Sequence, residues 1–197
     1  MKYKLILASA SPRRRELLTQ IGAEFEVIPA KGEEIPASAK PEQAVLELSR
    51  QKAEEVAGTL SREAGNIVVL GADTVVSLDG NILGKPKDKE DAARMLGMLN
   101  SREHSVFTGV TMIARSFHSE EIISFYQETK VFMYPMTSRQ IQAYTDTGEP
   151  MDKAGSYGIQ GKGAVYIEKI AGDYNNVVGL PVAAIYQKLE KTGIEIL

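Results

Sequence analysis

The amino-acid sequence predicts one α/β domain, built on a mixed central β-sheet with flanking helices. Short apolar runs typical of strands alternate along the chain with segments of helical periodicity. The chain has 197 residues, 43% hydrophobic and 25% charged, which is ordinary for a globular domain. No internal repeat, low-complexity segment or clear linker interrupts it. We therefore expect a single domain over residues 1–197, with room for two lobes.

The N-terminal part predicts two strand–helix units followed by a buried strand. We expect strands at 5–8, 25–28 and 67–70 and helices at 12–20 and 41–57. Ser11 and Pro12 suit a helix start, because Ser is a good N-cap and Pro fits the first helical position. The run 67–70 is apolar throughout, which indicates an interior strand.

The C-terminal part continues the alternation. Asp79-Gly80 predicts a hairpin turn between strands at 74–78 and 81–83. Asp88 and Thr137 are expected to cap helices that reach about residues 99 and 145. Further strands are expected at 106–114, 122–133 and 165–170, a glycine-rich loop at 148–163, and a last helix from 181.

Composition excludes several classes of protein. The absence of cysteine removes disulfides, thiolate zinc sites and cysteine nucleophiles, and it favours a reducing cytoplasm. A net charge of −3 argues against a nucleic-acid binder. No apolar stretch approaches the ~18 residues of a membrane span, and the N-terminal apolar run is too short for a signal peptide. His104 and His118 stand in no metal-ligand motif, and we interpret both as surface or loop residues.

Three arginines stand at the start of the helix predicted at 12–20. Helix N-termini favour acidic side chains, so Arg13–Arg15 have the wrong sign for this place. Helical geometry turns Arg14 toward the apolar face and its two neighbours to either side. An anion here would satisfy the arginines and the open backbone N–H groups together. We favour such an anion site, beginning at Ser9; the alternative is an internal salt bridge, for example to Glu33 or Glu34.

Two further charges stand in apolar surroundings. Lys52 lies within the apolar stripe of its helix, so we expect a phosphate or carboxylate partner unless it reaches solvent. Asp73, in Gly71-Ala-Asp-Thr74, follows the strand 67–70, and functional residues of α/β sheets gather at the carboxyl ends of strands. It can hold a divalent cation or act as a general base; the alternative is a turn or cap. Lys85, in Gly84-Lys-Pro86, is an isolated cation at a tight bend.

Taken together, these motifs resemble the Maf family. They are Ser9-x-Ser-Pro-Arg-Arg14, Gly71-Ala-Asp-Thr74, Gly84-Lys-Pro86 and Glu149-Pro-Met-Asp-Lys-Ala-Gly-Ser-Tyr-Gly-Ile-Gln-Gly161, in order over the whole chain. The Asp-Thr pair and Gly-Ile-Gln-Gly are similar to the branch that hydrolyses dTTP and UTP rather than the branch associated with 7-methyl-GTP. Ser156 stands where such loops often have alanine, and we expect no consequence.

The resemblance implies a nucleoside triphosphate pyrophosphatase, which cuts between the α- and β-phosphates. It also implies the fold of the inosine triphosphatases, with two lobes around a cleft, a need for Mg²⁺ or Mn²⁺, a homodimer and a link to septum formation. By position, Asp73 matches the family's proton acceptor. Arg13, Thr74 and Gln160 match positions that set substrate choice.

Residue chemistry and resemblance combine into one mechanistic hypothesis. Arg13, Arg14, Lys52 and Lys85 would clamp the phosphates while Asp73 activates water. Glu34 is the candidate second carboxylate near the metal. Gln160 has a donor and an acceptor, which suits the imide edge of uracil or thymine.

Two other classes of function stay open at this point. One is a nucleotide-binding regulator of division with little turnover. The other is a nucleic-acid binder that uses the arginine run, which the acidic balance disfavours.

Overall fold

The structure is a computed structural model that describes residues 2–32, 38–61, 65–117 and 119–197. Its strands are β1 Lys4–Leu7, β2 Phe25–Val27, β3 Ile67–Leu78, β4 Asn81–Leu83, β5 Glu103–Arg115, β6 Glu120–Met133 and β7 Ile167–Ala171. Its α-helices are α1 Pro12–Gln20, α2 Pro41–Thr59, α3 Lys89–Leu99, α4 Ser138–Asp146, α5 Tyr174–Val178 and α6 Val182–Thr192. Three 3₁₀ helices, η1 Glu149–Asp152, η2 Ala154–Ser156 and η3 Gly161–Tyr166, occupy the predicted glycine-rich loop.

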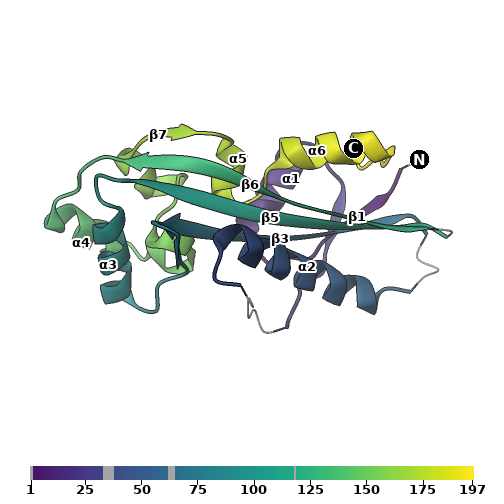
Figure 1. Ribbon diagram of the computed structural model, residues 1–197, viewed down its shortest axis with the longest axis horizontal. Helices are drawn as coiled ribbons and strands as arrows, with labels where there is room; N and C mark the ends of the chain where they lie inside the picture. Colours follow the sequence, from purple (N-terminus) through teal and green to yellow (C-terminus); the bar gives the residue numbers. More distant parts are fainter. Residues whose placement is uncertain (1, 33–37, 62–64, 118) are drawn as a thin grey trace.

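The sheet is mixed, as predicted. The strand order is β2-β1-β3-β5-β6-β7, and β4 pairs with β3 outside this path. β1 runs parallel to β2 and β3, whereas β3, β5, β6 and β7 pair antiparallel. In Figure 1 the long strands β5 and β6 extend along the molecule, with α2 on one face and α1 and α6 on the other. The α/β class with a mixed central sheet is therefore confirmed.

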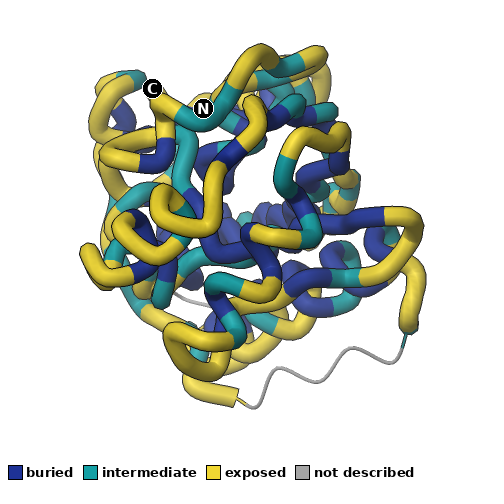
Figure 2. Tube along the Cα trace, turned by 90° about the vertical axis from the view of Figure 1, so that its left-hand side faces the viewer, coloured by how far each residue is buried: buried dark blue, intermediate teal, exposed yellow. Residues whose placement is uncertain are grey.

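The apolar core is divided along the length of the sheet. One cluster gathers beneath α1 and α6, around Leu18 and Ile185, and a second lies between α3 and the far end of the sheet, around Leu96. A third packs α2 against the other face of the sheet, around Val56. β3 contributes Leu70 to the first cluster and Leu78 to the second. Figure 2, viewed along the sheet, shows buried segments in the interior and exposed ones around them. Two lobes thus share continuous strands, in agreement with the two-lobed expectation.

Local signals in the sequence position several element ends. The Asp88 carboxylate accepts from the Asp91 N–H at 2.7 Å at the start of α3, and Thr137 with Gln140 forms a capping box at α4. Asp79 and Gly80 both adopt positive φ, 52° and 80°, as a two-residue hairpin turn requires. These predicted caps and this turn are confirmed.

Two expectations about elements need correction, and one helix was missed. The strands expected at 67–70 and 74–78 form one continuous strand, β3. The strand expected at 165–170 starts later, at Ile167, because η3 precedes it. The short helix α5 was not predicted, although the Asp173 side chain caps it by accepting from the Asn175 N–H at 2.8 Å. Within the described residues, no helix is both long enough and apolar enough to cross a membrane.

Candidate active site

A cleft of ≈ 830 Å³ opens between the two lobes. Its walls come from the β1–α1 loop, α2, the middle of β3, the bend at Gly84-Lys85 and the segment Glu149–Gly161. All the predicted site residues that the structure describes line this cleft: Ser9, Arg13, Arg14, Lys52, Asp73, Thr74, Lys85 and Gln160. Glu34, the candidate second metal ligand, lies outside the described residues.

Part of the β3 edge that borders the cleft has no neighbouring strand among the described residues. β1 pairs with β3 as far as Leu70, and β4 pairs with it only from Val76 onward. Among the described strands, none pairs with residues 71–75 on that edge, while β5 continues along the other. Asp73 therefore lies mid-strand, not at a strand's carboxyl end as predicted; what ends at Leu70 is the parallel ladder with β1. The cleft that the resemblance implies is present, and it borders this edge of β3, where the described strands leave residues 71–75 unpaired.

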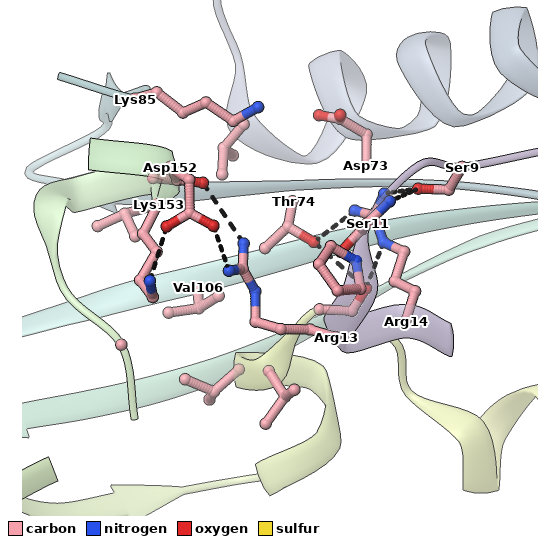
Figure 3. A pocket seen from close by; sticks show the side chains of 18 of the residues that line it. Ser9, Ser11, Arg13, Arg14, Asp73, Thr74, Lys85, Val106, Asp152 and Lys153 are labelled. Atoms are coloured by element: carbon pink, nitrogen blue, oxygen red, sulfur yellow. Dashed lines mark hydrogen bonds and ion pairs between the residues drawn. The ribbon is translucent and has the colours of Figure 1, made fainter. Parts of the chain in front are cut away.

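Arg14 is buried and connects three segments at the cleft. Its guanidinium donates to the Gly179 carbonyl at 2.9 Å, to Ser9 Oγ at 3.0 Å and to Thr74 Oγ1 at 3.1 Å (Figure 3). The inward direction predicted from the helical angles is confirmed. These bonds give Arg14 a cross-linking task in addition to the positive charge that it brings to the cleft.

Arg13 is held across the cleft by Asp152. Its Nη1 lies 2.7 Å from Asp152 Oδ2, and Lys153 Nζ lies 2.7 Å from Asp152 Oδ1. Burial alone would raise the pKa of Asp152, but the hydrogen bonds from Lys153 and Arg13 outweigh it and lower the pKa to about 2. The salt-bridge alternative thus applies to Arg13, with a partner from the glycine-rich segment that the sequence reasoning did not name. Figure 3 shows Arg13 and Asp152 facing each other beside Thr74.

Lys52 has the carboxylate partner expected of a shielded lysine. Its Nζ lies 2.6 Å from Asp73 Oδ1, and the two side chains are only 12% and 11% exposed. The pair forms because α2 approaches β3 closely: a Cβ on Gly71 would stand 2.2 Å from the Ser49 carbonyl oxygen. In Figure 3 Lys85 extends toward Asp73 from the opposite wall. The ammonium groups of Lys52 and Lys85 therefore lie on two sides of the Asp73 carboxylate in the cleft.

Glu149 shapes the segment that carries Gln160. Its Oε1 accepts from the Tyr144 hydroxyl at 2.9 Å and from the Gly163 N–H at 3.1 Å, and its Oε2 accepts from the Lys162 N–H at 3.0 Å. Burial raises the pKa of Glu149, but these bonds together lower it below its usual value. Sequence reasoning missed Glu149 and Asp152 as site residues. The glycine-rich pattern around them was the available signal, because such a loop needs internal acceptors to be ordered.

His104 corrects the expectation of a surface residue. It is only 3% exposed, and its Nε2 lies 2.7 Å from the hydroxyl of Tyr157, which lines the cleft. Burial lowers the pKa of His104 to about 4, so the ring is neutral near pH 7. His118 lies outside the described residues.

A family model described as "Maf-like protein" matches residues 4–192. The chain belongs to the Maf family. A Maf relative from Agathobacter rectalis, named "dTTP/UTP pyrophosphatase", is 56% identical over 98% of this chain and 99% of its own length. One of the same name from Carboxydothermus hydrogenoformans is 50% identical over 96% and 99%. A crystal structure of a "Nucleoside-triphosphatase / dITP/XTP pyrophosphatase" from Mycobacterium abscessus covers 98% of both chains at 15% identity and a TM-score of 0.43.

The donor set suits a cation that is shared with substrate phosphates. In the part of the chain that the structure describes, no three His, Asp or Glu side chains gather into a possible metal cage. Mg²⁺ commonly uses one or two carboxylates together with substrate phosphates and water. Asp73 fits one such contact, because Lys52 occupies Oδ1 and Oδ2 has no hydrogen-bond partner among the described residues.

Proposed function

We propose that this Maf protein is a nucleoside triphosphate pyrophosphatase that hydrolyses dTTP and UTP to the nucleoside monophosphate and pyrophosphate. The observation that carries the proposal is the shielded Lys52–Asp73 pair, which lies in a cleft with Arg13, Arg14 and Lys85. The names of the two relatives, matched over nearly their whole length, support the same reaction.

The charged wall of the cleft suits the triphosphate. Lys52 and Lys85 reach the cleft from α2 and from the bend after β4, and both can contact phosphate oxygens. A polyanion also competes with Asp152 for Arg13, whose ion pair is partly exposed. We infer that the phosphates lie between these cations.

Asp73 is the candidate proton acceptor. The Lys52 ammonium donates to Oδ1 and thereby orients the carboxylate, which leaves Oδ2 to take a proton from water. That water would attack the α-phosphorus and expel pyrophosphate. Among the described residues, two other carboxylates line the cleft, and both are engaged elsewhere, Glu149 by backbone N–H groups and Asp152 by two cations.

The opposite side of β3 suits the nucleobase. Thr74 points away from Asp73, because consecutive strand residues face opposite sides of a sheet. Beside it the cleft is lined by the apolar residues Val76, Val106 and Val177. A flat pyrimidine ring can lie against this apolar wall, with Thr74 and Gln160 available to its polar edge.

A divalent cation completes the proposal. Mg²⁺ or Mn²⁺ would be held mainly by the triphosphate oxygens beside Asp73, and the ion would neutralise the charge that develops on the phosphates while Asp73 Oδ2 stays open to water. The predicted homodimer, the cytoplasmic location and the link to septum formation stay predictions.

A panel of nucleoside triphosphates, assayed for pyrophosphate with and without Mg²⁺, tests the proposal. We expect release from dTTP and UTP above all others, and a fall in kcat of ~10²-fold or more in Asp73→Asn. Asp146→Asn, an exposed carboxylate outside the cleft lining, is the matched control and should match the parent. Absence of turnover in the parent would favour the regulator alternative, and full activity of Asp73→Asn would remove Asp73 from the mechanism.

A further inference from the structure

Behind Thr74 lies a buried hydrogen-bond chain that the proposed reaction does not yet use. Thr74 on β3 pairs in register with Thr108 on β5, and their Oγ1 atoms lie 3.0 Å apart. Thr108 is 0% exposed and does not line the cleft. Its Oγ1 lies 3.0 Å from the backbone carbonyl of Asn176 in α5. Thr108 therefore connects a residue of the cleft to a fixed point in the core.

The direction of each bond in this chain follows from counting hydrogens. A carbonyl oxygen can only accept, so the single hydroxyl hydrogen of Thr108 goes to Asn176. Thr108 can then only accept from Thr74, and Thr74 must donate its own hydrogen to Thr108. The Gly179 carbonyl is a poorer acceptor for Thr74, because it lies 3.5 Å away and already accepts from Arg14 Nε at 2.9 Å.

The remaining hydrogen-bonding position of the Thr74 hydroxyl is open to the cleft. Arg14 Nη2 donates to Thr74 Oγ1 at 3.1 Å and uses one of its two lone pairs. With its hydrogen committed to Thr108, Thr74 has only one acceptor position left for a ligand. Thr74 is half-buried and lines the cleft, so a bound molecule can reach that lone pair.

Further hydrogen bonds hold the Asn176 end of this hydrogen-bond chain in place. The fully buried Asn176 side chain donates to the Val106 carbonyl at 3.1 Å and to Thr129 Oγ1 at 3.0 Å. These bonds hold α5 against β5 and β6, so the Asn176 carbonyl cannot turn away from Thr108. These contacts in the core thus determine that the Thr74 hydroxyl donates to Thr108 and can only accept from a ligand in the cleft.

We propose that Thr108 is a positioning residue for substrate choice, which fixes Thr74 as an acceptor toward the nucleobase. Uracil and thymine carry an N–H donor at N3, whereas cytosine carries an acceptor there. An acceptor-only Thr74 therefore favours uracil and thymine over cytosine. The inference depends on the proposed function, since it names how that same cleft selects its pyrimidine.

Removal of the Thr108 hydroxyl tests the inference. In Thr108→Val the Thr74 hydrogen loses its acceptor and can turn toward the cleft, where it can serve cytosine. We expect the ratio of kcat/KM for UTP over CTP to fall roughly tenfold. Thr108→Ser keeps the hydroxyl and should keep the parent ratio.

Thr111→Val is the matched control. Thr111 is an equally buried threonine of β5, but it faces α2, where its hydroxyl contacts those of Ser49 and Ser124 at 3.0 Å. The Thr111→Val variant should keep the UTP over CTP ratio even if its melting temperature falls. An equal loss for UTP and CTP in Thr108→Val would mean that Thr108 only supports folding, and it would overturn the inference.

The parent protein gives a second test that needs no variant. UTP methylated at N3 has lost the donor, whereas UTP methylated at C5 keeps it and carries the same added group. We expect kcat/KM for the N3-methylated nucleotide to be at least tenfold lower. Similar rates for both would overturn the inference while leaving pyrophosphatase activity intact; failure to hydrolyse UTP at all would instead overturn the proposed function.

Discussion

Acidification from pH 7 to pH 5 should destabilise the folded protein through His104. The ring is buried, and its Nδ1 has no hydrogen-bond partner among the described residues. Burial lowers the pKa of His104 from 6.5 to about 4. The unfolded chain then binds more protons than the native protein between these values, so stability falls as the pH falls from about 6.5 to about 4.

The size of the effect follows from the two pKa values. At about 1.36 kcal/mol per pH unit, the interval between 6.5 and about 4 corresponds to about 3 kcal/mol of unfolding free energy. About 2 kcal/mol of this is lost between pH 7 and pH 5. That is a large share of the ~5–15 kcal/mol that stabilises a typical domain.

Urea unfolding at both pH values measures the prediction. The parent should lose about 2 kcal/mol more than His104→Gln between pH 7 and pH 5, because glutamine does not titrate. Other titrating groups affect both proteins alike and cancel in this difference. Since the sequence has only two histidines, the ring resonances identify the titration directly, and His118→Gln assigns them. Equal pH dependence in the parent and His104→Gln, or a His104 midpoint near 6.5, would refute the reasoning.

Three more changes test the packing of the site. In Gly71→Ala the added Cβ would stand 2.2 Å from the Ser49 carbonyl oxygen, so we expect a loss of ~2–3 kcal/mol by thermal unfolding; Gly97→Ala, whose Cβ meets nothing within 4 Å in α3, should instead gain up to ~1 kcal/mol. Glu149→Gln places an amide N–H against backbone N–H groups, so KM for UTP should rise several-fold in steady-state assays. Ser156→Ala loses only a contact with a methionine sulfur. It should leave kcat unchanged and lower the free energy of unfolding by no more than ~0.5–1 kcal/mol.

Features of the site that depend on local geometry could be predicted from the sequence. The direction of Arg14 follows from helical angles over a few residues, and the need of Lys52 for an anionic partner, though not the identity of that partner, follows from the cost of an unpaired buried charge. The caps Asp88 and Thr137 follow from the chemistry of helix ends. Each of these inferences needs only the element in which the residue stands.

Features that depend on distant segments could not be predicted. Asp152 meets Arg13 across 139 positions of the chain, and no local pattern encodes that distance. His104 stands in no metal-ligand motif, which favoured a surface or loop residue; the observed β5 begins at Glu103, three residues before the predicted strand, and carries His104 into the core. Glycine and aspartate have low strand propensity, so the sequence suggested a break at 71–73, where pairing with β5 keeps the strand intact.

The continuity of β3 through that segment explains why two kinds of recognition meet in one cleft. An ordinary paired strand separates the two faces of a sheet, and neighbouring side chains such as Asp73 and Thr74 cannot serve one ligand. Here no strand among the described residues pairs with the edge of β3 between the β1 and β4 ladders, so both faces border the same cavity. A shift of one residue would exchange the carboxylate and the hydroxyl. Gly71 and Gly109 oppose such a shift, because α2 lies too close to either position to admit a Cβ.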